Sequence, residues 1–202
     1  MRHARVLLLA ASLLGLAGAA ACGRTEEAAM PASSSMPHAA AGDSSLALRS
    51  PAFAPGQPLP MRFTCEAEGV SPPLQWSGVP AGTRSLALIV EDPDAPDPAA
   101  PQRVFVHWVL YDLPAGSDGL PEGVAAAQLP AGTRQGRNDW KRTGFGAACP
   151  PVGRHRYVHR LYALDIALPD LHEPDKARLL AAMEGHVLAQ AELVGTYEKR
   201  AH

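Results

Sequence analysis

The 202-residue sequence contains no block or stripe of basic residues, since its 18 Lys and Arg are set against 20 Asp and Glu, a formal net charge of −2. Proteins that bind nucleic acid carry such a basic footprint, so the sequence argues against nucleic acid as a partner. It also lacks the GxSxG motif of a nucleophile elbow and the HExxH and CxxC spacings of common metal sites. The sequence therefore indicates no enzymatic nucleophile, metal or other cofactor.

The N-terminus has a short positive stretch followed by an apolar run, residues 6–21, that is too short to span a membrane comfortably. Arg2 and Arg5 supply the charge and small residues end the run, a pattern typical of an export signal. Because small residues precede Cys22, we predict a lipoprotein signal whose cleavage leaves Cys22 as the acylated N-terminus. Such signals usually carry Leu where this chain has Ala19, so simple cleavage with a free Cys22 thiol is the alternative. We expect an exported protein, periplasmic or anchored to a membrane by this lipid.

Composition divides the sequence into three parts. Residues 1–21 are the predicted signal peptide, and residues 22–45, rich in Ala, Ser, Pro and Met without an apolar period, are a predicted flexible tether. Residues 46–202 are long enough for a single domain with its own core. The sequence holds 18 Gly and 20 Pro, many of them in turn signals of this last part, which favours a loop-rich β protein.

Short apolar runs between turn residues predict strands, and one periodic segment predicts a helix. Runs such as LALIV and VFVHWVL are apolar at both odd and even positions, as expected of strands covered on two faces. The helix is predicted over residues 174–190, where Leu179, Met183, Val187 and their neighbours fall on one stripe at helical spacing. Strands first and a helix late indicate an antiparallel β architecture with a helix packed at one end. The predicted strands cover residues 46–50, 61–64, 74–76, 85–91, 104–111, 155–168 and 191–197.

The loop DPDAP, residues 92–96, is stiffened by proline and carries two carboxylates. Asp92 and Asp94 alternate around a proline and would point the same way in an extended chain. Because an Asp-Pro-Asp sequence often forms a turn in which a carboxylate accepts backbone N–H groups, we expect one of the two to have this structural role. A cis peptide bond between Ala95 and Pro96 is a further hypothesis.

Histidines stand in two of the predicted strands. A lone His107 in an apolar run is more often a hydrogen-bonded core residue than a functional one, but a nearby carboxylate of DPDAP would favour its protonated form. An imidazolium at the floor of a pocket would suit an anion. In the later strand His155, Tyr157 and His159 share one face. Arg156 faces the other way, and we expect it to pair with a carboxylate beneath the loop.

Apart from Cys22, the sequence has two cysteines, Cys65 and Cys149. Disulfides persist in exported proteins, so we predict that these two are bridged, with two separate thiols as the alternative. Cys149 begins CPPVG, a second proline-stiffened loop, whose backbone N–H groups at Cys149 and Val152 offer a nest for an anion. The predicted bridge would fix this loop in place.

Several longer strings occur in one order between about residue 46 and residue 197. They are FTCEAEGVSPPLQWSGVP (63–80), DPDAP (92–96), VHWVLYDLP (106–114), QGRNDW (135–140) and CPPVGRHRY (149–157). Together they resemble the phosphatidylethanolamine-binding protein family, and most of all its bacterial, Raf-kinase-inhibitor-like branch. The resemblance implies a mainly β fold, an antiparallel β-sandwich with a few peripheral helices including one near the C-terminus.

The resemblance also implies which residues bind the ligand. It marks Asp92 as the carboxylate of a small polar pocket and leaves Asp94 a structural role. The ligand-binding residues that it implies are Asp92, His107, Cys149 through its backbone, His155 and Tyr157, with Asp94, Pro96, Arg137 and Trp140 at the rim of the pocket.

The string QGRNDW adds a segment to this site. Asn138 and Asp139 are expected to form a turn, Trp140 to cover the edge of the pocket and Arg137 to add affinity for an anion. A solvated loop with one buried tryptophan is an equally good interpretation of the same residues.

The function that follows is that of a non-catalytic binding protein for small anionic ligands: phosphate, phosphomonoesters or phospholipid headgroups. Such a protein can also inhibit a partner protein, whose identity the sequence does not give. Two alternatives stay open. One is a phosphoester-processing enzyme that uses an Asp/His pair as general acid and base, and the other is a surface interaction protein whose pocket is vestigial.

Overall fold

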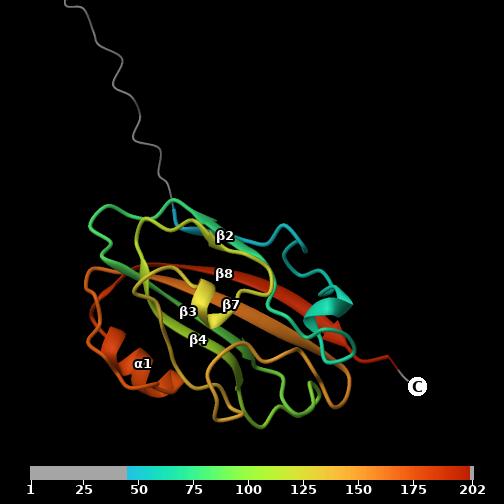
Figure 1. Ribbon diagram of the computed structural model, residues 1–202. Coiled ribbons are helices and arrows are strands. Elements are labelled where there is room, and N and C mark those ends of the chain that lie inside the picture. Colours follow the sequence, from blue (N-terminus) through green and yellow to red (C-terminus); the bar gives the residue numbers. More distant parts are fainter. Residues whose placement is uncertain (1–44, 201–202) are drawn as a thin grey trace, which may run out of the picture. The chain divides into compact units, whose positions relative to one another are not determined.

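The computed structural model describes residues 45–200, which form two antiparallel sheets, one α-helix and two single-turn 3₁₀ helices (Figure 1). The predicted signal peptide, Cys22 and nearly all of the predicted tether lie outside the described residues. The smaller sheet has the strand order β1-β2-β5, and its strands are β1 (Ala47–Arg49), β2 (Leu74–Ser77) and β5 (Gly119–Leu120). The larger has the order β6-β4-β3-β7-β8, and its strands are β6 (Arg134–Gln135), β4 (Phe105–Pro114), β3 (Ser85–Asp92), β7 (Arg154–Leu164) and β8 (Val187–Glu198).

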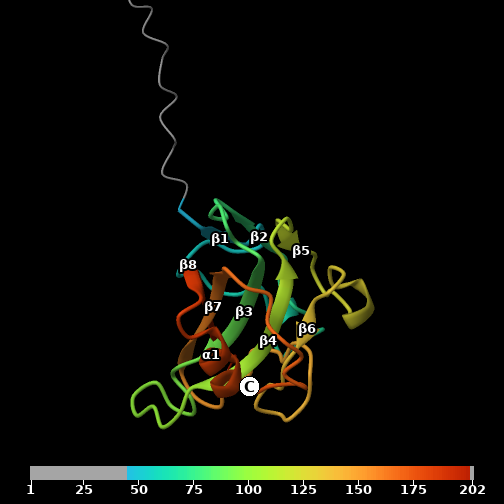
Figure 2. The same cartoon turned by 90° about the vertical axis from the view of Figure 1, so that its left-hand side faces the viewer.

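The central strand β3 is buried along its whole length, because both faces of the larger sheet are covered. On one face Leu86 and Leu88 pack in a core shared with the smaller sheet. On the other, Ile89 packs in a second core with Leu179 and Met183 of the helix α1 (Lys176–Met183). Figure 2 shows the resulting layers, with the smaller sheet and α1 on opposite sides of the larger sheet. The mainly β, antiparallel architecture predicted from the sequence is confirmed.

The C-terminal helix is shorter than predicted. The Asp175 side chain caps its start by accepting a hydrogen bond from the Arg178 N–H at 2.9 Å. It ends at Met183 because Gly185 adopts a φ of 78°, a left-handed conformation that stops helices. The prediction that the helix continues to residue 190 is therefore wrong, and Val187 and Leu188 begin β8, where both are exposed.

A second correction concerns residues 61–64, which were expected to form a strand. They form a 3₁₀ turn, Met61–Phe63, in which the Phe63 N–H donates to the Pro60 carbonyl at 3.1 Å. The two-residue strands β5 and β6 are too short to leave a periodic signal, and the sequence did not predict them. Within residues 45–200, no helix has the length and the hydrophobicity needed to cross a bilayer.

The predicted disulfide between Cys65 and Cys149 is present and joins residues 84 positions apart. It holds the segment that follows the 3₁₀ turn against the loop that precedes β7. The adjacent backbone supports this contact, since the Cys65 N–H donates to the Ala148 carbonyl at 3.0 Å.

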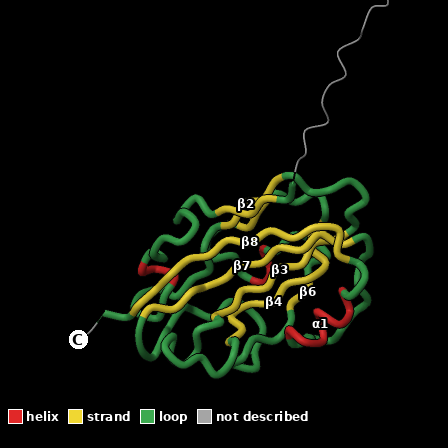
Figure 3. The backbone as a smooth tube through the Cα atoms, turned by 180° about the vertical axis from the view of Figure 1, so that it is seen from behind, coloured by secondary structure: helices red, strands yellow, loops and turns green. Residues whose placement is uncertain are grey.

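The antiparallel order brings the two proline-rich loops to one end of the larger sheet. There β3 ends at Asp92, which pairs in register with Phe105 at the start of β4. β7 begins at Arg154 on the other side of β3, so its first residues lie at the same end. Figure 3 shows the strands of this sheet side by side, with loops gathered beyond their ends.

Candidate ligand-binding site

A hollow of about 310 Å³ opens at this end of the sheet, within the size range of roughly 300–1,000 Å³ that is usual for small-molecule sites. The DPDAP and CPPVG loops, the start of β4 and the start of β7 all contribute to it. Its lining residues are Asp92, Ala95, Pro96, Arg103, Phe105, His107, Trp140, Cys149, Pro151 and Tyr157.

The structure brings most of the predicted residues together around this hollow. Those that line it are Asp92, Pro96, His107, Trp140, Cys149 and Tyr157. Asp94, Arg137 and His155 do not line it.

Asp94 lies behind the loop and pairs with Arg156. The Arg156 guanidinium donates to both carboxylate oxygens, at 2.6 Å from Nη2 to Oδ1 and 2.9 Å from Nε to Oδ2. These hydrogen bonds hold the pKa of Asp94 below its usual value, against the opposing effect of burial. The ion pair between Asp94 and Arg156 thus gives Asp94 the structural role predicted for it and Arg156 the carboxylate partner predicted for it. The Ala95–Pro96 bond is cis, as hypothesised.

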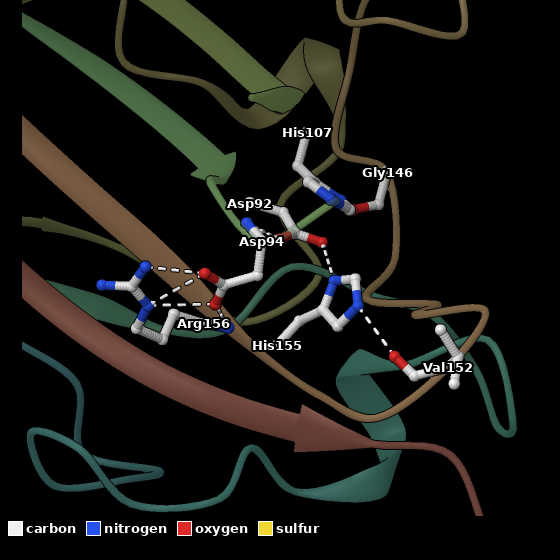
Figure 4. Close-up of polar contacts among 7 residues, drawn as sticks. All are labelled: Asp92, Asp94, His107, Gly146, Val152, His155 and Arg156. Atoms are coloured by element: carbon white, nitrogen blue, oxygen red, sulfur yellow. Dashed lines mark hydrogen bonds and ion pairs between the residues drawn. The ribbon is translucent and has the colours of Figure 1, made fainter. Parts of the chain in front are cut away.

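Asp92 is held in place on both of its carboxylate oxygens. Oδ1 accepts the Asp94 backbone N–H at 2.8 Å, the turn interaction expected of one aspartate in this loop. Oδ2 lies 2.7 Å from Nδ1 of His155. In Figure 4 the carboxylate lies between the imidazoles of His107 and His155.

His155 is fully buried and has no nitrogen left for a ligand. Its Nδ1 bonds to Asp92, and its Nε2 lies 3.0 Å from the Val152 carbonyl oxygen (Figure 4). An ionised carboxylate and a carbonyl can only accept, so the imidazole satisfies both when each of its nitrogens carries a hydrogen. His155 thus supports Asp92 and the CPPVG loop from behind, and the ligand contact expected of it stays a prediction.

His107 lies at the base of the hollow and is 4% exposed. Its Nδ1 donates to the Gly146 carbonyl at 2.8 Å. Burial lowers the pKa of His107, and this outweighs the opposing influence of that carbonyl and of the Asp92 carboxylate. The sequence had favoured an imidazolium at this position, and the buried site instead favours the neutral ring.

Aromatic rings surround His107. The ring centroids of Phe105, Trp140 and Tyr157 lie 5.4, 5.1 and 5.2 Å from that of His107. At the mouth of the hollow the Arg103 guanidinium stacks over the Phe105 ring, 4.7 Å from its centroid. The sequence analysis assigned neither Phe105 nor Arg103 to the site. Phe105 lies two positions before His107 on the same face of β4, so strand periodicity could have predicted it. Arg103 lies in an irregular loop, where no periodic pattern indicates its position.

The 138–140 turn carries Trp140 to the edge of the hollow. The buried Asn138 side chain accepts the Trp140 backbone N–H at 3.0 Å and donates to the Gly144 carbonyl at 3.0 Å. Asp139 joins the turn to β4 by accepting the Val106 N–H at 2.8 Å. The predicted turn is confirmed. Arg137 points elsewhere, with its Nε 3.1 Å from a Glu173 carboxylate oxygen.

Tyr157 carries a buried hydroxyl with no hydrogen-bond partner of ordinary geometry among the described residues. Burial raises the pKa of Tyr157, and the Asp92 carboxylate raises it further, while the nearby Cys149 backbone lowers it to a smaller degree. The hydroxyl therefore keeps its proton and remains a hydrogen-bond donor at neutral pH.

Two larger hollows, of about 480 and 430 Å³, lie beside the C-terminal end of β8 and over the paired strands β2 and β5. Neither contains any of the residues that the sequence analysis assigned to a site. The smaller hollow is the stronger candidate because buried polar groups converge on it, not because of its size. Within residues 45–200, no three His, Cys, Asp or Glu side chains are placed to hold one metal ion.

Comparison with known proteins gives matches over the same part of the chain. Residues 49–198 match the family model for phosphatidylethanolamine-binding protein. A UPF0098 protein of Methanothermobacter thermautotrophicus is 47% identical over 153 residues, which make up 75% of this chain and 98% of that protein. The crystal structure of a phosphatidylethanolamine-binding protein homologue from Chlamydia trachomatis has a TM-score of 0.72 and 42% identity, covering 78% of this chain and 99% of that one. E. coli YbcL has a TM-score of 0.69 and 33% identity, with coverages of 77% and 99%.

Proposed function

The chain belongs to the phosphatidylethanolamine-binding protein family, and from this premise we propose that it binds a small phosphate-bearing anion in the hollow beside Asp92. The ligand class comprises phosphate itself, phosphomonoesters and the phosphate groups of phospholipid headgroups. The protein acts by binding, without turnover of the ligand.

The observation that carries this proposal is the buried hydroxyl of Tyr157, whose proton has no acceptor of ordinary geometry among the described residues. A buried polar group without a partner costs free energy, roughly 1–3 kcal/mol, so native structures rarely keep one without a reason. Tyr157 lines the hollow, and its hydroxyl retains its proton. An oxyanion in the hollow would accept this hydrogen bond and so satisfy the hydroxyl.

The charges around the hollow suit an anion of low charge. Arg103 supplies a cation at the mouth, and its stacking on Phe105 keeps the guanidinium in position. The Asp92 carboxylate does not stand alone, because His155 compensates its charge when both ring nitrogens carry hydrogens. The backbone of Cys149 and the proline rings of the two loops provide a rigid wall.

The arrangement gives less support to a phosphoester-processing enzyme. The acid–base pair expected from the sequence is His107 with Asp92, but Asp92 is already held on both carboxylate oxygens by the Asp94 N–H and by His155. Of that pair, His107 is left as the side chain with a nitrogen that could exchange a proton with the ligand. The Cys149 sulfur is in a disulfide. The residues that line the hollow therefore offer no nucleophile of the Ser, Thr or thiol kind.

Isothermal titration calorimetry of the purified protein with phosphate, phosphoethanolamine and acetate tests the proposal. Tyr157→Phe removes only the hydroxyl, so it should leave the fold intact and weaken phosphate binding by roughly tenfold or more, the usual worth of a hydrogen bond to a charged group. Tyr162→Phe is the matched control, because Tyr162 lies on the same strand but packs into the second core.

Two outcomes would overturn the proposal. One is the absence of phosphate binding to the native protein, which would leave a surface interaction protein with a vestigial pocket as the better hypothesis. The other is phosphate binding that Tyr157→Phe leaves unchanged, which would put the anion elsewhere. Release of phosphate from phosphoethanolamine would revive the enzymatic alternative.

We also propose that the protein is exported and held at a membrane by a lipid on Cys22, with residues 22–45 as its tether. The charged start, the apolar run and the small residues before Cys22 support this. Mass spectrometry of the membrane fraction tests it: an acylated N-terminal Cys22 is the expected product, and an unmodified Cys22 would contradict it.

A further inference from the structure

The hydrogen bond between His107 and Gly146 fixes which nitrogen of His107 carries its proton. Nδ1 lies 2.8 Å from the Gly146 carbonyl oxygen, and a carbonyl oxygen can only accept. Nδ1 must therefore hold a hydrogen. In a neutral imidazole the other nitrogen, Nε2, then bears a lone pair and accepts hydrogen bonds.

The surroundings of His107 keep its ring neutral. Asp92 on β3 and Asp139 on the 138–140 turn favour the charged form, whereas His155 on β7 opposes it, and Tyr157 on β7 remains uncharged. Burial of the ring outweighs the two carboxylates and lowers the pKa of His107. The cation at the mouth, Arg103, likewise disfavours a second positive charge in the same hollow.

Nε2 has no partner among the described residues, although the His107 ring lines the hollow. The rings of Phe105, Trp140 and Tyr157 pack around it without offering it a hydrogen-bond donor of ordinary geometry. Beside it stands the Asp92 carboxylate, which is also an acceptor. The deep wall of the hollow thus presents lone pairs where a simple anion site would present donors.

Resting on the function proposed above, we propose that this wall selects an oxyanion that still carries a proton. The hollow accepts a phosphomonoester in its monoprotonated form, whose P–OH donates to His107 Nε2 or to Asp92 while its other oxygens accept from Tyr157 and Arg103. It discriminates against anions that have no proton to donate, namely sulfate esters and phosphodiesters. Within the ligand class proposed above, it therefore favours phosphate and phosphomonoesters over the phosphodiester of an intact phospholipid. His107 is then a specificity-determining residue.

The physical reason is the same one that governs any buried acceptor. An anion with only lone pairs would face lone pairs on His107 and Asp92, so both sides would lose their hydrogen bonds to water without replacement. One proton on the ligand turns this repulsive contact into a hydrogen bond. Phosphomonoesters lose that proton with a pKa of about 6, so about half of them carry it at pH 6 and about a tenth at pH 7, whereas sulfate esters and phosphodiesters carry none in this range.

Three ligands of equal charge isolate the effect of the proton. In its monoprotonated form methyl phosphate carries a single negative charge, as do methyl sulfate and dimethyl phosphate, but only methyl phosphate can donate. Calorimetric titration of the native protein at pH 6 should give a dissociation constant for methyl phosphate at least tenfold below those of the other two. Methyl sulfate, similar in size and shape to methyl phosphate, is the decisive comparison.

The affinity for methyl phosphate should also fall by about fifty-fold from pH 6 to pH 8. About half of the ester carries its proton at pH 6 and about one part in a hundred at pH 8, given a pKa near 6. Methyl sulfate has no proton that dissociates in this pH range. Any change in its affinity therefore reports proton uptake or release by the protein and is subtracted.

His107→Asn provides the test on the protein side. The shorter amide can still donate to the Gly146 carbonyl, but it ends short of the position of Nε2, so methyl phosphate should lose its advantage over methyl sulfate. The ligand comparison on the native protein stands even if this variant does not fold. Methyl sulfate binding within twofold of methyl phosphate would overturn the selectivity and leave the proposed function standing. No binding of any of the three at pH 6 would overturn both.

Discussion

The Asp92 carboxylate and the His155 imidazole form a buried pair, with Oδ2 of Asp92 2.7 Å from Nδ1 of His155. The side chains are 5% and 0% exposed, so neither exchanges its partner for water. Because His155 also bonds to the Val152 carbonyl, this one ring connects the DPDAP loop to the CPPVG loop. The two walls of the hollow are thus held at a fixed spacing by a residue that does not itself line it.

Replacing His155 should therefore cost both stability and affinity. We expect His155→Leu to lower the free energy of unfolding by roughly 3–5 kcal/mol, the cost of leaving a buried charge without its partner. Urea denaturation measures this. Asp92→Asn and the double variant complete a mutant cycle, in which the pair should show a coupling of about 1 kcal/mol or more. Costs that simply add would mean that the two side chains do not stabilise one another.

A second prediction concerns the Cys65–Cys149 disulfide, which closes a loop of 84 residues and has Cys149 in the wall of the hollow. In the chain-entropy model a loop of this length stabilises the fold by roughly 4–5 kcal/mol, an upper value because denatured chains retain structure. We expect the double variant Cys65→Ala/Cys149→Ala to lose a large part of this stabilisation. It should also bind phosphate more weakly, because the disulfide no longer holds the CPPVG loop in place.

The native protein in a reducing agent is the control for that double variant. Both cysteine residues are exposed, so reduction should reproduce the loss of stability, and the double variant should not respond to the reducing agent. Thiol titration of the unreduced, denatured protein should find neither Cys65 nor Cys149 reactive. Two reactive thiols there would contradict the bridge.

The sequence predicted the loops of the site better than the orientation of its histidines. Proline fixes local geometry, so DPDAP and CPPVG were recognisable as rigid loops from their residues alone. Strand parity placed His155 and Tyr157 on one face, but it does not tell which of them lies under the Asp92 carboxylate. The charge of His107 depends on burial by residues distant in sequence, which no local pattern reveals.

The errors in the fold have equally specific causes. The helical stripe in residues 174–190 continued past Gly185 because apolar spacing alone does not detect a left-handed glycine, although the glycine itself was a visible stop signal. A strand was predicted where the 3₁₀ turn Met61–Phe63 lies, because three residues are too few to distinguish one periodicity from another.

A third prediction follows from the close approach of Gly146 to Trp140. A methyl group on Gly146 would overlap the indole ring, three of whose carbons lie within 2.8 Å of that position. Trp140 is 42% exposed, so in Gly146→Ala the ring should swing outward into water and open one wall of the hollow. We expect phosphate affinity to fall severalfold with little change in unfolding free energy.

Acrylamide quenching of tryptophan fluorescence reports the movement of Trp140, because Trp76 and Trp108 are only 4% and 2% exposed. Quenching should increase in Gly146→Ala, and Trp140→Phe, which lacks the mobile ring, should show little quenching with or without the glycine substitution. Unchanged quenching together with unchanged affinity would mean that the ring does not form part of the site.

A fourth prediction concerns stability against pH and rests on His159, behind the hollow. The ring is 1% exposed, and burial lowers the pKa of His159 to about 4 from an ordinary value of about 6.5. Between these two values the unfolded chain binds a proton that the folded protein does not. Stability should therefore be fully present above about pH 6.5 and fall as the pH drops towards 4, by about 1.4 kcal/mol per unit and on the order of 3 kcal/mol in all.

Urea denaturation between pH 7 and pH 4.5 measures this slope. His159→Phe keeps a ring beside Phe53, whose centroid lies 5.8 Å away, and a void of about 10 Å³ borders the site of the added volume. Whatever its absolute stability, His159→Phe should lose much of the slope of unfolding free energy against pH. The slope that remains should come from His107, whose pKa burial also lowers. His172→Asn, at an exposed histidine, is the control and should retain the native slope. If His159→Phe also retained it, the proton would be taken up elsewhere in the unfolded chain, and His159 would not limit stability in mild acid.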